Sequence, residues 1–139
     1  KKPAKRKSLK GIKVLLAEDN DLNAELAAIL LEDSEMIVTR AADGQEVVDL
    51  FANHPAGTYD IILMDIMMPK MDGLQAAKAI RAMQAERPDA EEIPIIALSA
   101  NAFAEDVQTS LDAGMNGHVS KPLNVAEVAK VIARNLNKS

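Results

Sequence analysis

The sequence contains no cysteine and no tryptophan, and its only aromatic residues apart from histidine are Phe51, Phe103 and Tyr59. The lack of cysteine excludes disulfide bonds and thiolate metal sites and is typical of a reducing compartment. Aromatic side chains do not alternate with basic ones, so nucleic acid is not an expected ligand. No apolar run approaches the roughly 20 residues of a membrane span, and no signal peptide is visible. We therefore expect a soluble cytoplasmic domain with no direct membrane contact; any membrane anchor would belong to a parent chain.

Charge is distributed unevenly along the 139 residues, which the net charge of −5 conceals. Six cations and no acid occupy residues 1–10, so residues 11–139 carry a net charge of −11. An acidic body argues against a nucleic-acid-binding arm at the basic start. We expect residues 1–10 to be a basic linker or tail, and residues 11–139 to form one domain. The first residue is not methionine, so we expect the chain to be part of a longer protein.

Short apolar runs alternate with amphipathic helical patterns along the chain. We expect strands at residues 12–17, 36–41, 59–64, 94–98 and 117–120. Five helices are expected between and after them: one after Asn20 or Asp21, one starting at residues 43–44, one over 74–87, one ending near Gly114 and one over 125–136. This alternation predicts an α/β fold with a single doubly wound, five-stranded parallel sheet and helices on both faces. The third run is the most apolar and is expected at the centre.

The apolar faces of these helices predict which side chains are buried, and residues 88–92 read as a polar hinge. The side chains expected to face inward are Leu22, Leu26, Ile29 and Leu30 in the first helix, Val47, Val48, Leu50 and Phe51 in the second, Phe103, Val107 and Leu111 in the fourth, and Val125, Val128, Ile132 and Leu136 in the last.

Polar residues suited to phosphoryl chemistry follow four of the predicted strands. Glu18 and Asp19 follow the first, Asp65 the third, Ser99 the fourth, and Lys121 the fifth. In an open α/β sheet the carboxyl ends of the strands line one crevice, where ligands bind. Such a cluster suits a divalent cation and a phosphoryl group, because the metal offsets carboxylate repulsion and an ammonium pairs with phosphate oxygens.

Each of these residues also has a plain structural interpretation. Glu18 and Asp19 could belong to a helix N-terminus, Ser99 could be a helix cap, and Lys121 could be a solvated side chain. Asp65 favours the functional interpretation, because a carboxylate at the mouth of the most apolar strand is costly unless it is paired or used. The turn after the first strand carries acids in place of glycines, which argues against a nucleotide site.

Four segments at residues 14–20, 62–73, 95–102 and 113–123 together resemble the response-regulator receiver domains of two-component and phosphorelay signalling. The segments occur in the family's order, and the resemblance covers nearly the whole chain after Lys10. Their sequences, which include Met-Pro-x-Met-Asp-Gly and Ala-Leu-Ser-Ala-Asn-Ala, are most similar to those of receivers in hybrid sensor histidine kinases. The resemblance implies a flavodoxin-like receiver architecture.

By this resemblance, Asp65 would accept a phosphoryl group from a phosphohistidine on a partner. Glu18, Asp19, Asp65 and the main-chain carbonyl of Met67 would hold Mg²⁺, which prefers oxygen ligands. Lys121 would pair with the phosphoryl oxygens. The resemblance thus implies a phosphorelay domain with Mg²⁺ as its cofactor.

The resemblance also implies a switch, in which Ser99 moves to hydrogen-bond the phosphoryl group and so changes the surface. Receivers usually carry Tyr or Phe three residues before the lysine, and this chain has His118 there. His118 is therefore a candidate switch residue, and a histidine can also titrate.

No glycine-rich ATP loop and no recognisable phosphodonor helix occur in the sequence, so we expect no kinase activity beyond self-catalysed phosphotransfer and dephosphorylation. The expected partners are a histidine kinase core of a parent chain, a histidine phosphotransfer domain, or both, docking around residues 22–29. Two alternatives remain: a stand-alone response regulator, and a receiver-like interaction module that is never phosphorylated. An enzyme of the haloacid-dehalogenase type is less suitable, because Met67 stands where those enzymes carry a second Asp.

Overall fold

The computed structural model describes residues 9–99, 104–121 and 123–136. Over these residues, five strands form one sheet in the order β2-β1-β3-β4-β5, and all neighbouring strands are parallel. This order confirms the predicted doubly wound fold and the central position of the third strand. The strands are β1 (Lys13–Ala17), β2 (Ile37–Ala41), β3 (Ile61–Asp65), β4 (Ile95–Ser99) and β5 (Gly117–Ser120).

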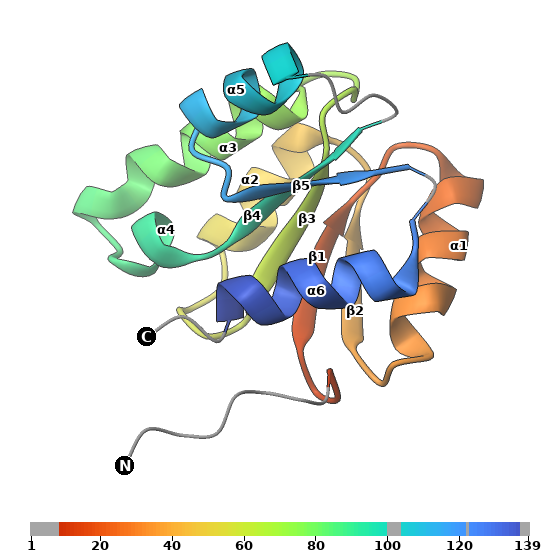
Figure 1. Cartoon of the computed structure of the whole chain (residues 1–139). Helices are drawn as coiled ribbons and strands as arrows, with labels where there is room; N and C mark the ends of the chain where they lie inside the picture. The colour runs from red at the N-terminus through yellow and green to blue at the C-terminus, as the bar shows by residue number, and fades with distance from the viewer. Residues whose placement is uncertain (1–8, 100–103, 122, 137–139) are drawn as a thin grey trace.

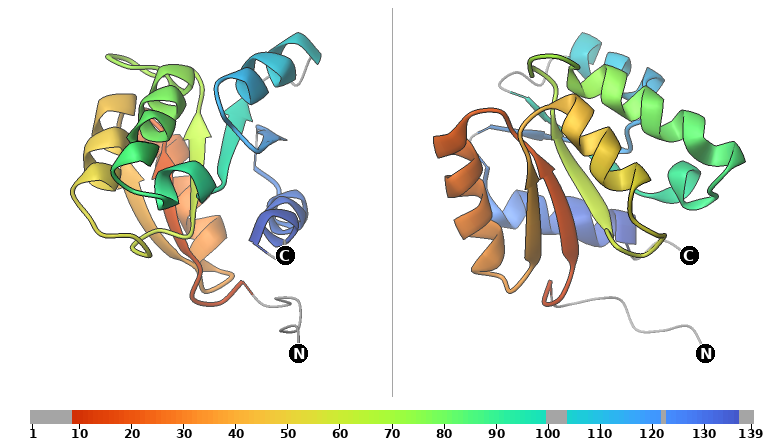
Figure 2. Two further views of the ribbon diagram at one scale, coloured as in Figure 1. Left: turned by 90° about the vertical axis from the view of Figure 1, so that its left-hand side faces the viewer. Right: turned by 180° about the vertical axis from the view of Figure 1, so that it is seen from behind.

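Helices cover both faces of the sheet (Figure 1; Figure 2). α1 (Asp21–Glu32) and α6 (Val125–Leu136) pack on one face, while α2 (Gly44–Ala52), α3 (Gly73–Arg81) and the single-turn α4 (Asp89–Glu92) pack on the other. A 3₁₀ helix, η1 (Ala82–Ala85), leads from α3 toward α4, and α5 (Ala104–Asp112) lies beside β5. Among the described residues, no helix is both long and apolar enough to cross a bilayer.

Two apolar cores lie on either side of the sheet because successive strand residues point to opposite faces. In β1, Leu15 and Ala17 contribute to the core beneath α2 and α3, whereas Val14 and Leu16 contribute to the core beneath α1 and α6. All five residues of β3 are buried. A strand covered on both faces reads as a continuous apolar run, as the sequence shows.

Side-chain caps define the first residues of the helices that follow β1, β2 and β3. Of the two predicted caps of α1, Asn20 is the one used: its side chain accepts a hydrogen bond from the Asn23 N–H at 2.9 Å, and Asp43 caps α2 in the same way. Asp72 and Gln75 form a reciprocal capping box at the start of α3. Gly114 follows α5 with φ of +99°, which confirms the expected C-terminal glycine.

The predicted inward face of the first helix is wrong for three of its four residues, while Leu30 is partly buried. Leu22, Leu26 and Ile29 are 63%, 56% and 56% exposed, whereas Ala24, Ala27 and Leu31 are the buried residues of α1. The small alanine side chains let the helix backbone approach the sheet closely, which turns three large apolar side chains outward. In α2 the prediction holds better, since Val47 and Phe51 are buried and Val48 and Leu50 are partly buried.

The buried residues expected in the last two helices are partly confirmed. Val128 and Ile132 of α6 are buried, whereas Leu111 of α5 is 47% exposed. Phe103 and the side chains of Val125 and Leu136 lie outside what the structure describes.

The segment predicted as one helix over residues 74–87 followed by a hinge is instead divided into α3, η1 and α4. The guanidinium of Arg81, the last residue of α3, donates hydrogen bonds to the carbonyls of Ala90, Ile93 and Gly114 at 2.7–3.0 Å. Arg87 lies over the Phe51 ring and donates to the Phe51 carbonyl at 2.7 Å. These contacts fold the segment back onto the domain, and they join residues too distant in sequence for a local pattern to reveal.

Candidate metal and phosphoryl site

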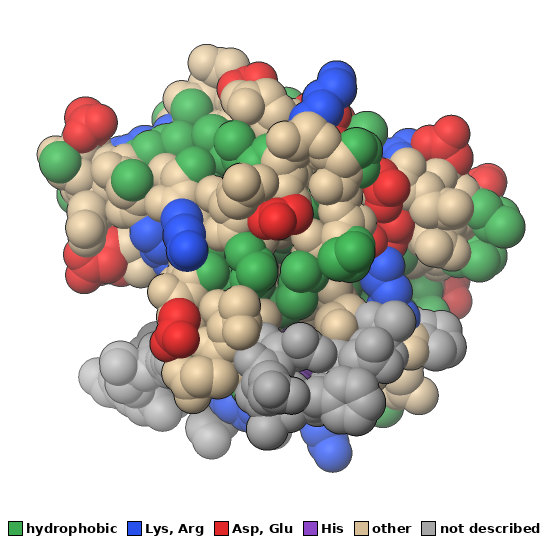
Figure 3. Space-filling model, turned by 90° about the horizontal axis from the view of Figure 1, so that it is seen from above, with side chains coloured by type: hydrophobic (Ala, Val, Ile, Leu, Met, Phe, Trp, Pro, Cys, Tyr) green, Lys and Arg blue, Asp and Glu red, His purple; other side chains and the backbone are tan. Residues whose placement is uncertain are grey.

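Three carboxylates meet at the carboxyl ends of β1 and β3. Glu18 directly follows β1, and Asp65 is the last residue of β3. Glu18 and Asp65 are only 3% and 4% exposed, whereas Asp19 is exposed. One oxygen of each carboxylate lies within 4.8 Å of the other two. The predicted convergence of Glu18, Asp19 and Asp65 is thus present in the fold. Seen from above, the surface of the molecule carries acidic, basic and hydrophobic side chains interspersed with one another (Figure 3).

Lys121 brings a cation to two of these acids. Its Nζ lies 2.7 Å from Asp65 Oδ2 and 3.0 Å from Glu18 Oε1, and its side chain is 25% exposed. The Lys121 N–H also donates to the Ser99 carbonyl at 2.8 Å, so the residue after β5 is held beside the end of β4. One ammonium therefore serves two buried carboxylates.

The electrostatics of this group follow from burial and from shared charge. Burial raises the pKa of Glu18 above its ordinary value of 4.5, and this effect outweighs the hydrogen bond from Lys121, which lowers it. For Lys121, burial by itself lowers the pKa, but the hydrogen bonds to Asp65 and Glu18 dominate and raise it. The ammonium is therefore firmly protonated, and three carboxylates still exceed one cation. An oxygen-rich site with excess negative charge is what a divalent cation such as Mg²⁺ requires.

Of the other predicted site residues, Met67 and Ser99 adjoin this cluster, whereas the His118 side chain lines a separate cavity together with residues of α6. Met67 is 78% exposed, and its N–H donates to Asp65 Oδ1 at 3.2 Å, which orients the carboxylate. Ser99 ends β4 and pairs in the ladder with Ser120, directly before Lys121. His118 lies two residues earlier in β5, opposite Ala97; it is partly buried, and its Nε2 has no hydrogen-bond partner among the described residues.

Gly73 is a site residue whose role the sequence did not reveal. A Cβ at this position would lie 2.3 Å from the Asp65 carbonyl oxygen and 2.9 Å from the Ile66 Cα. Its N–H donates to the Ile66 carbonyl at 2.9 Å. Only glycine lets α3 begin directly against the backbone of the acidic strand end. The resemblance contained this glycine within its Met-Pro-x-Met-Asp-Gly segment, but not the contact.

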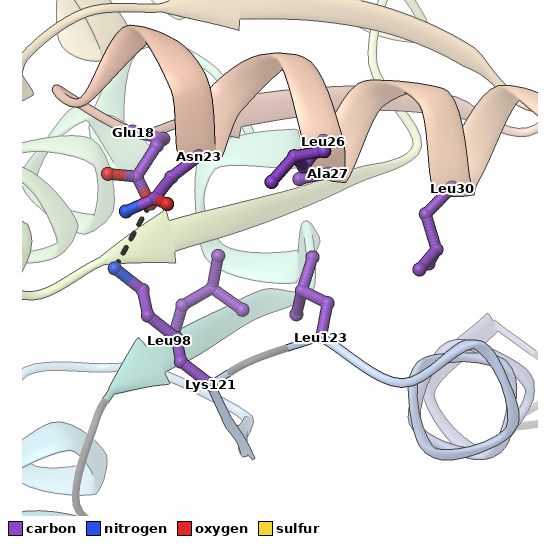
Figure 4. Close-up of a pocket in the computed structure, with 8 residues that line it drawn as sticks. All are labelled: Glu18, Asn23, Leu26, Ala27, Leu30, Leu98, Lys121 and Leu123. Carbon is purple, nitrogen blue, oxygen red and sulfur yellow. Dashed lines mark ion pairs between the residues drawn. The ribbon is translucent and has the colours of Figure 1, made fainter.

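A cavity of about 430 Å³ opens beside the cluster, between α1 and the segment that follows β5 (Figure 4). The Glu18–Lys121 ion pair forms its polar end, and leucines form much of its wall. Leu26 belongs both to this wall and to the exposed stripe of α1, which is formed by Leu22, Leu26 and Ile29. The lining residues are Glu18, Asn23, Leu26, Ala27, Leu30, Leu98, Lys121 and Leu123.

Comparison with known proteins identifies the family. The profile of the response regulator receiver domain matches residues 14–133, and the chain belongs to this family. It is 37% identical over 122 residues to the sensor protein GacS of Pseudomonas syringae pv. syringae, and 39% identical over 122 residues to hybrid signal transduction histidine kinase I of Dictyostelium discoideum. These alignments cover 88% and 86% of the chain but only 13% and 7% of the relatives. The chain thus corresponds to the receiver portion of much longer kinases.

Solved structures agree with this assignment. The receiver domain of the sensor histidine kinase PA1611 from Pseudomonas aeruginosa PAO1, which has a magnesium ion coordinated in its active-site cleft, superposes with a TM-score of 0.80 at 36% identity, covering 92% of this chain and 99% of that one. The receiver domain of the Saccharomyces cerevisiae response regulator Ssk1, solved with the histidine phosphotransfer protein Ypd1, gives a TM-score of 0.81 at 28% identity, with 93% and 91% covered.

Proposed function

We propose that this receiver domain takes a phosphoryl group from a phosphohistidine onto Asp65 in a phosphorelay, as part of a hybrid sensor histidine kinase that works in the cytoplasm. The observation that carries the proposal is a buried Asp65 carboxylate that is hydrogen-bonded to Lys121 and lies within 4.8 Å of two further acids. A buried acid in a cluster with excess negative charge is costly unless a ligand uses it.

The donor set fits Mg²⁺. Glu18, Asp19, Asp65 and the carbonyl of Met67 would hold the ion, which supplies charge neutralisation for the phosphoryl oxygens. In the transfer, an Asp65 oxygen forms a bond to phosphorus while the phosphorus–nitrogen bond of the donor breaks, and the imidazole leaves with the electron pair. Lys121, 2.7 Å from Asp65 Oδ2, is placed to pair with the oxygens of the transferred group. Positioning and charge account for such a reaction without a protein acid or base.

The exposed stripe of α1 is the proposed docking surface for a histidine phosphotransfer domain or kinase core. Leu22, Leu26 and Ile29 expose more than half of their surface on α1, and Leu26 also lines the cavity whose polar end is formed by Glu18 and Lys121. An apolar stripe on a helix is the surface that helical partners bind. The complex of the Ssk1 receiver with Ypd1 supports this choice of partner.

Ser99 and His118 are the proposed switch residues. They lie on adjacent strands, and the β5 segment that contains His118 leads directly to Lys121. A shift of the Lys121 ammonium toward a phosphoryl group would therefore be felt along β5. His118→Phe should preserve a phosphorylation-dependent change in backbone NMR shifts of α5 and β5, and His118→Ala should reduce it; equal changes in both variants would contradict the assignment.

Intact mass after incubation with acetyl phosphate, with and without Mg²⁺, tests the function. The native chain should gain one phosphoryl group only with Mg²⁺, and Asp65→Asn should gain none. Asp60→Asn is the matched control, because Asp60 precedes the same strand at its opposite end and accepts a hydrogen bond from the Lys13 N–H at 2.9 Å. No gain in the native chain would favour the interaction module that is never phosphorylated.

Transfer from a phosphorylated histidine phosphotransfer protein tests the docking surface separately. Replacing Leu22, Leu26 and Ile29 by serine should slow this transfer at least about 10-fold, a loss of roughly 1.4 kcal/mol in transition-state stabilisation. Uptake from acetyl phosphate, which needs no docking, should stay unchanged. Leu111→Ser, at an exposed leucine of α5, is the control and should leave both rates unchanged. Native transfer rates in the triple variant would exclude α1 as the docking helix.

A further inference from the structure

Arg40, at the end of β2, contacts the loop that carries the metal-binding acids, although neither the family resemblance nor the sequence pattern marked it. Its Nε and one terminal nitrogen donate to the Glu18 carbonyl at 3.1 and 2.8 Å, and the same terminal nitrogen donates to the Asp19 carbonyl at 3.2 Å. The other terminal nitrogen lies 2.8 Å from Asp21 Oδ1, at the start of α1. The Arg40 side chain thus contacts three residues between the end of β1 and the start of α1: Glu18, Asp19 and Asp21.

The shape of the guanidinium explains why these contacts fix the loop. Its planar fork presents several N–H donors in a rigid arrangement, so it can bind adjacent carbonyls at once, which a lysine ammonium does with less geometric definition. The backbone adds a further restraint, since the Glu18 N–H donates to the Ala41 carbonyl at 3.0 Å. Glu18 is therefore held by β2 from both its N–H and its carbonyl.

The contacts with Arg40 lie where they can orient the Glu18 and Asp19 carboxylates relative to Asp65. The Glu18 and Asp19 carbonyls belong to the same two residues whose carboxylates approach Asp65. Rotation of these peptide groups would swing both carboxylates relative to Asp65. Partners behind the ligands commonly orient them, and loss of such a partner typically weakens metal binding by 10–100-fold.

We propose that Arg40 is a positioning residue that sets the Mg²⁺ affinity of the site by clamping the Glu18 and Asp19 carbonyls. The proposal rests on the function proposed above, and it adds a residue outside the ligand set. The ion pair with Asp21 is secondary, because Asp21 has a side chain that is 93% exposed, and exposed pairs contribute little.

Calorimetric titration of the whole chain with Mg²⁺ tests the proposal without depending on activity. Arg40→Ala should weaken Mg²⁺ binding about 10-fold or more. Arg40→Lys retains the charge but not the fork, so its affinity should fall between those of the alanine variant and the native chain. Asp21→Ala removes the ion pair and keeps the carbonyl contacts, and it should bind Mg²⁺ within about twofold of the native chain.

A second readout separates positioning from damage to the fold. At saturating Mg²⁺, the rate of phosphoryl uptake by Arg40→Ala should return close to the native rate, because the metal then holds the loop. Native Mg²⁺ affinity in Arg40→Ala, full recovery in Arg40→Lys, or an equal loss in Asp21→Ala would each overturn the clamp while leaving the proposed function intact. Failure of the native chain to bind Mg²⁺ would overturn both.

Discussion

Two clusters of charged side chains in this domain each hold one cation, but they differ in the number of acids around it. In the first, the Lys121 ammonium lies within 3.0 Å of both Glu18 and Asp65, and Asp19 is close by. In the second, Arg87 meets a single acid, Asp89, through two parallel hydrogen bonds of 2.9 Å. The first cluster is short of positive charge, whereas the second is neutral and complete.

This difference in charge balance distinguishes a cluster suited to binding a ligand from one that only stabilises the fold. The Arg87–Asp89 pair also holds the Phe51 carbonyl and ring, so it ties α4 to α2 and leaves no charge for a ligand. The Lys121 cluster lies at the carboxyl ends of the strands, and its excess negative charge suits a divalent cation. An ion pair is thus a functional signal when its charges do not balance.

Removal of the cation from each cluster should give the largest contrast. Lys121→Met leaves two buried carboxylates unpaired, and we expect it to lower the free energy of unfolding at pH 7 by roughly 3 kcal/mol without Mg²⁺. Arg87→Met should cost less, about 1 kcal/mol, because the single acid that it leaves unpaired, Asp89, has a side chain that is 24% exposed. Urea denaturation of both variants measures the contrast, and equal losses would contradict it.

Addition of Mg²⁺ should stabilise the first cluster and not the second. At a free concentration 100 times its dissociation constant, the ion should raise the free energy of unfolding by about 2.7 kcal/mol. Asp19→Asn should reduce this gain, and Asp89→Asn should keep it in full. Thermal unfolding with Mg²⁺ or with a chelator checks both variants. A gain that survives in Asp19→Asn would argue against Asp19 as a ligand.

The geometry of the first cluster should depend on Gly73. Gly73→Ala forces a Cβ against the Asp65 backbone, and we expect a loss of about 2 kcal/mol in unfolding free energy together with slower phosphoryl uptake. Gly57→Ala is the control: φ is +91° and no atom lies within 4 Å of the added Cβ, so it should cost about 1 kcal/mol and leave uptake unchanged. Normal uptake in Gly73→Ala would show that Asp65 tolerates displacement.

The two clusters should respond to acid in opposite directions. Burial raises the pKa of Glu18, so in metal-free protein its stabilising contribution is complete below pH 4.5 and is lost as the pH rises through the folded value. The hydrogen bond from Arg87 lowers the pKa of Asp89, so about 1 kcal/mol present above pH 3.8 is lost as the pH falls through the folded value. Unfolding measured from pH 3 to pH 7 should lose the first dependence in Glu18→Gln and the second in Asp89→Asn.

Much of the site could be predicted from the sequence, because the site residues stand directly after apolar runs. Glu18, Asp65, Ser99 and Lys121 each mark the end of a strand, and parallel strands bring their carboxyl ends to one edge. The strand-end pattern did not identify Arg40 or Gly73, and the physical reason is the same for both. Arg40 contacts the backbone of Glu18, and Gly73 lies against the backbone of Asp65. A contact with backbone atoms leaves no complementary residue type in the sequence.

The sequence by itself determined the order of the five strands along the chain, most of the helices between them, the C-terminal glycine at Gly114 and the polar residues at the strand ends, because periodicity and capping are local. The tertiary structure alone decided which face of α1 is buried, where α3 ends and how Arg40 holds the acidic loop. Each of these depends on how closely two distant segments approach. Alanines at the α1 contact bring the helix near the sheet, and the leucines that looked like core are left on the surface.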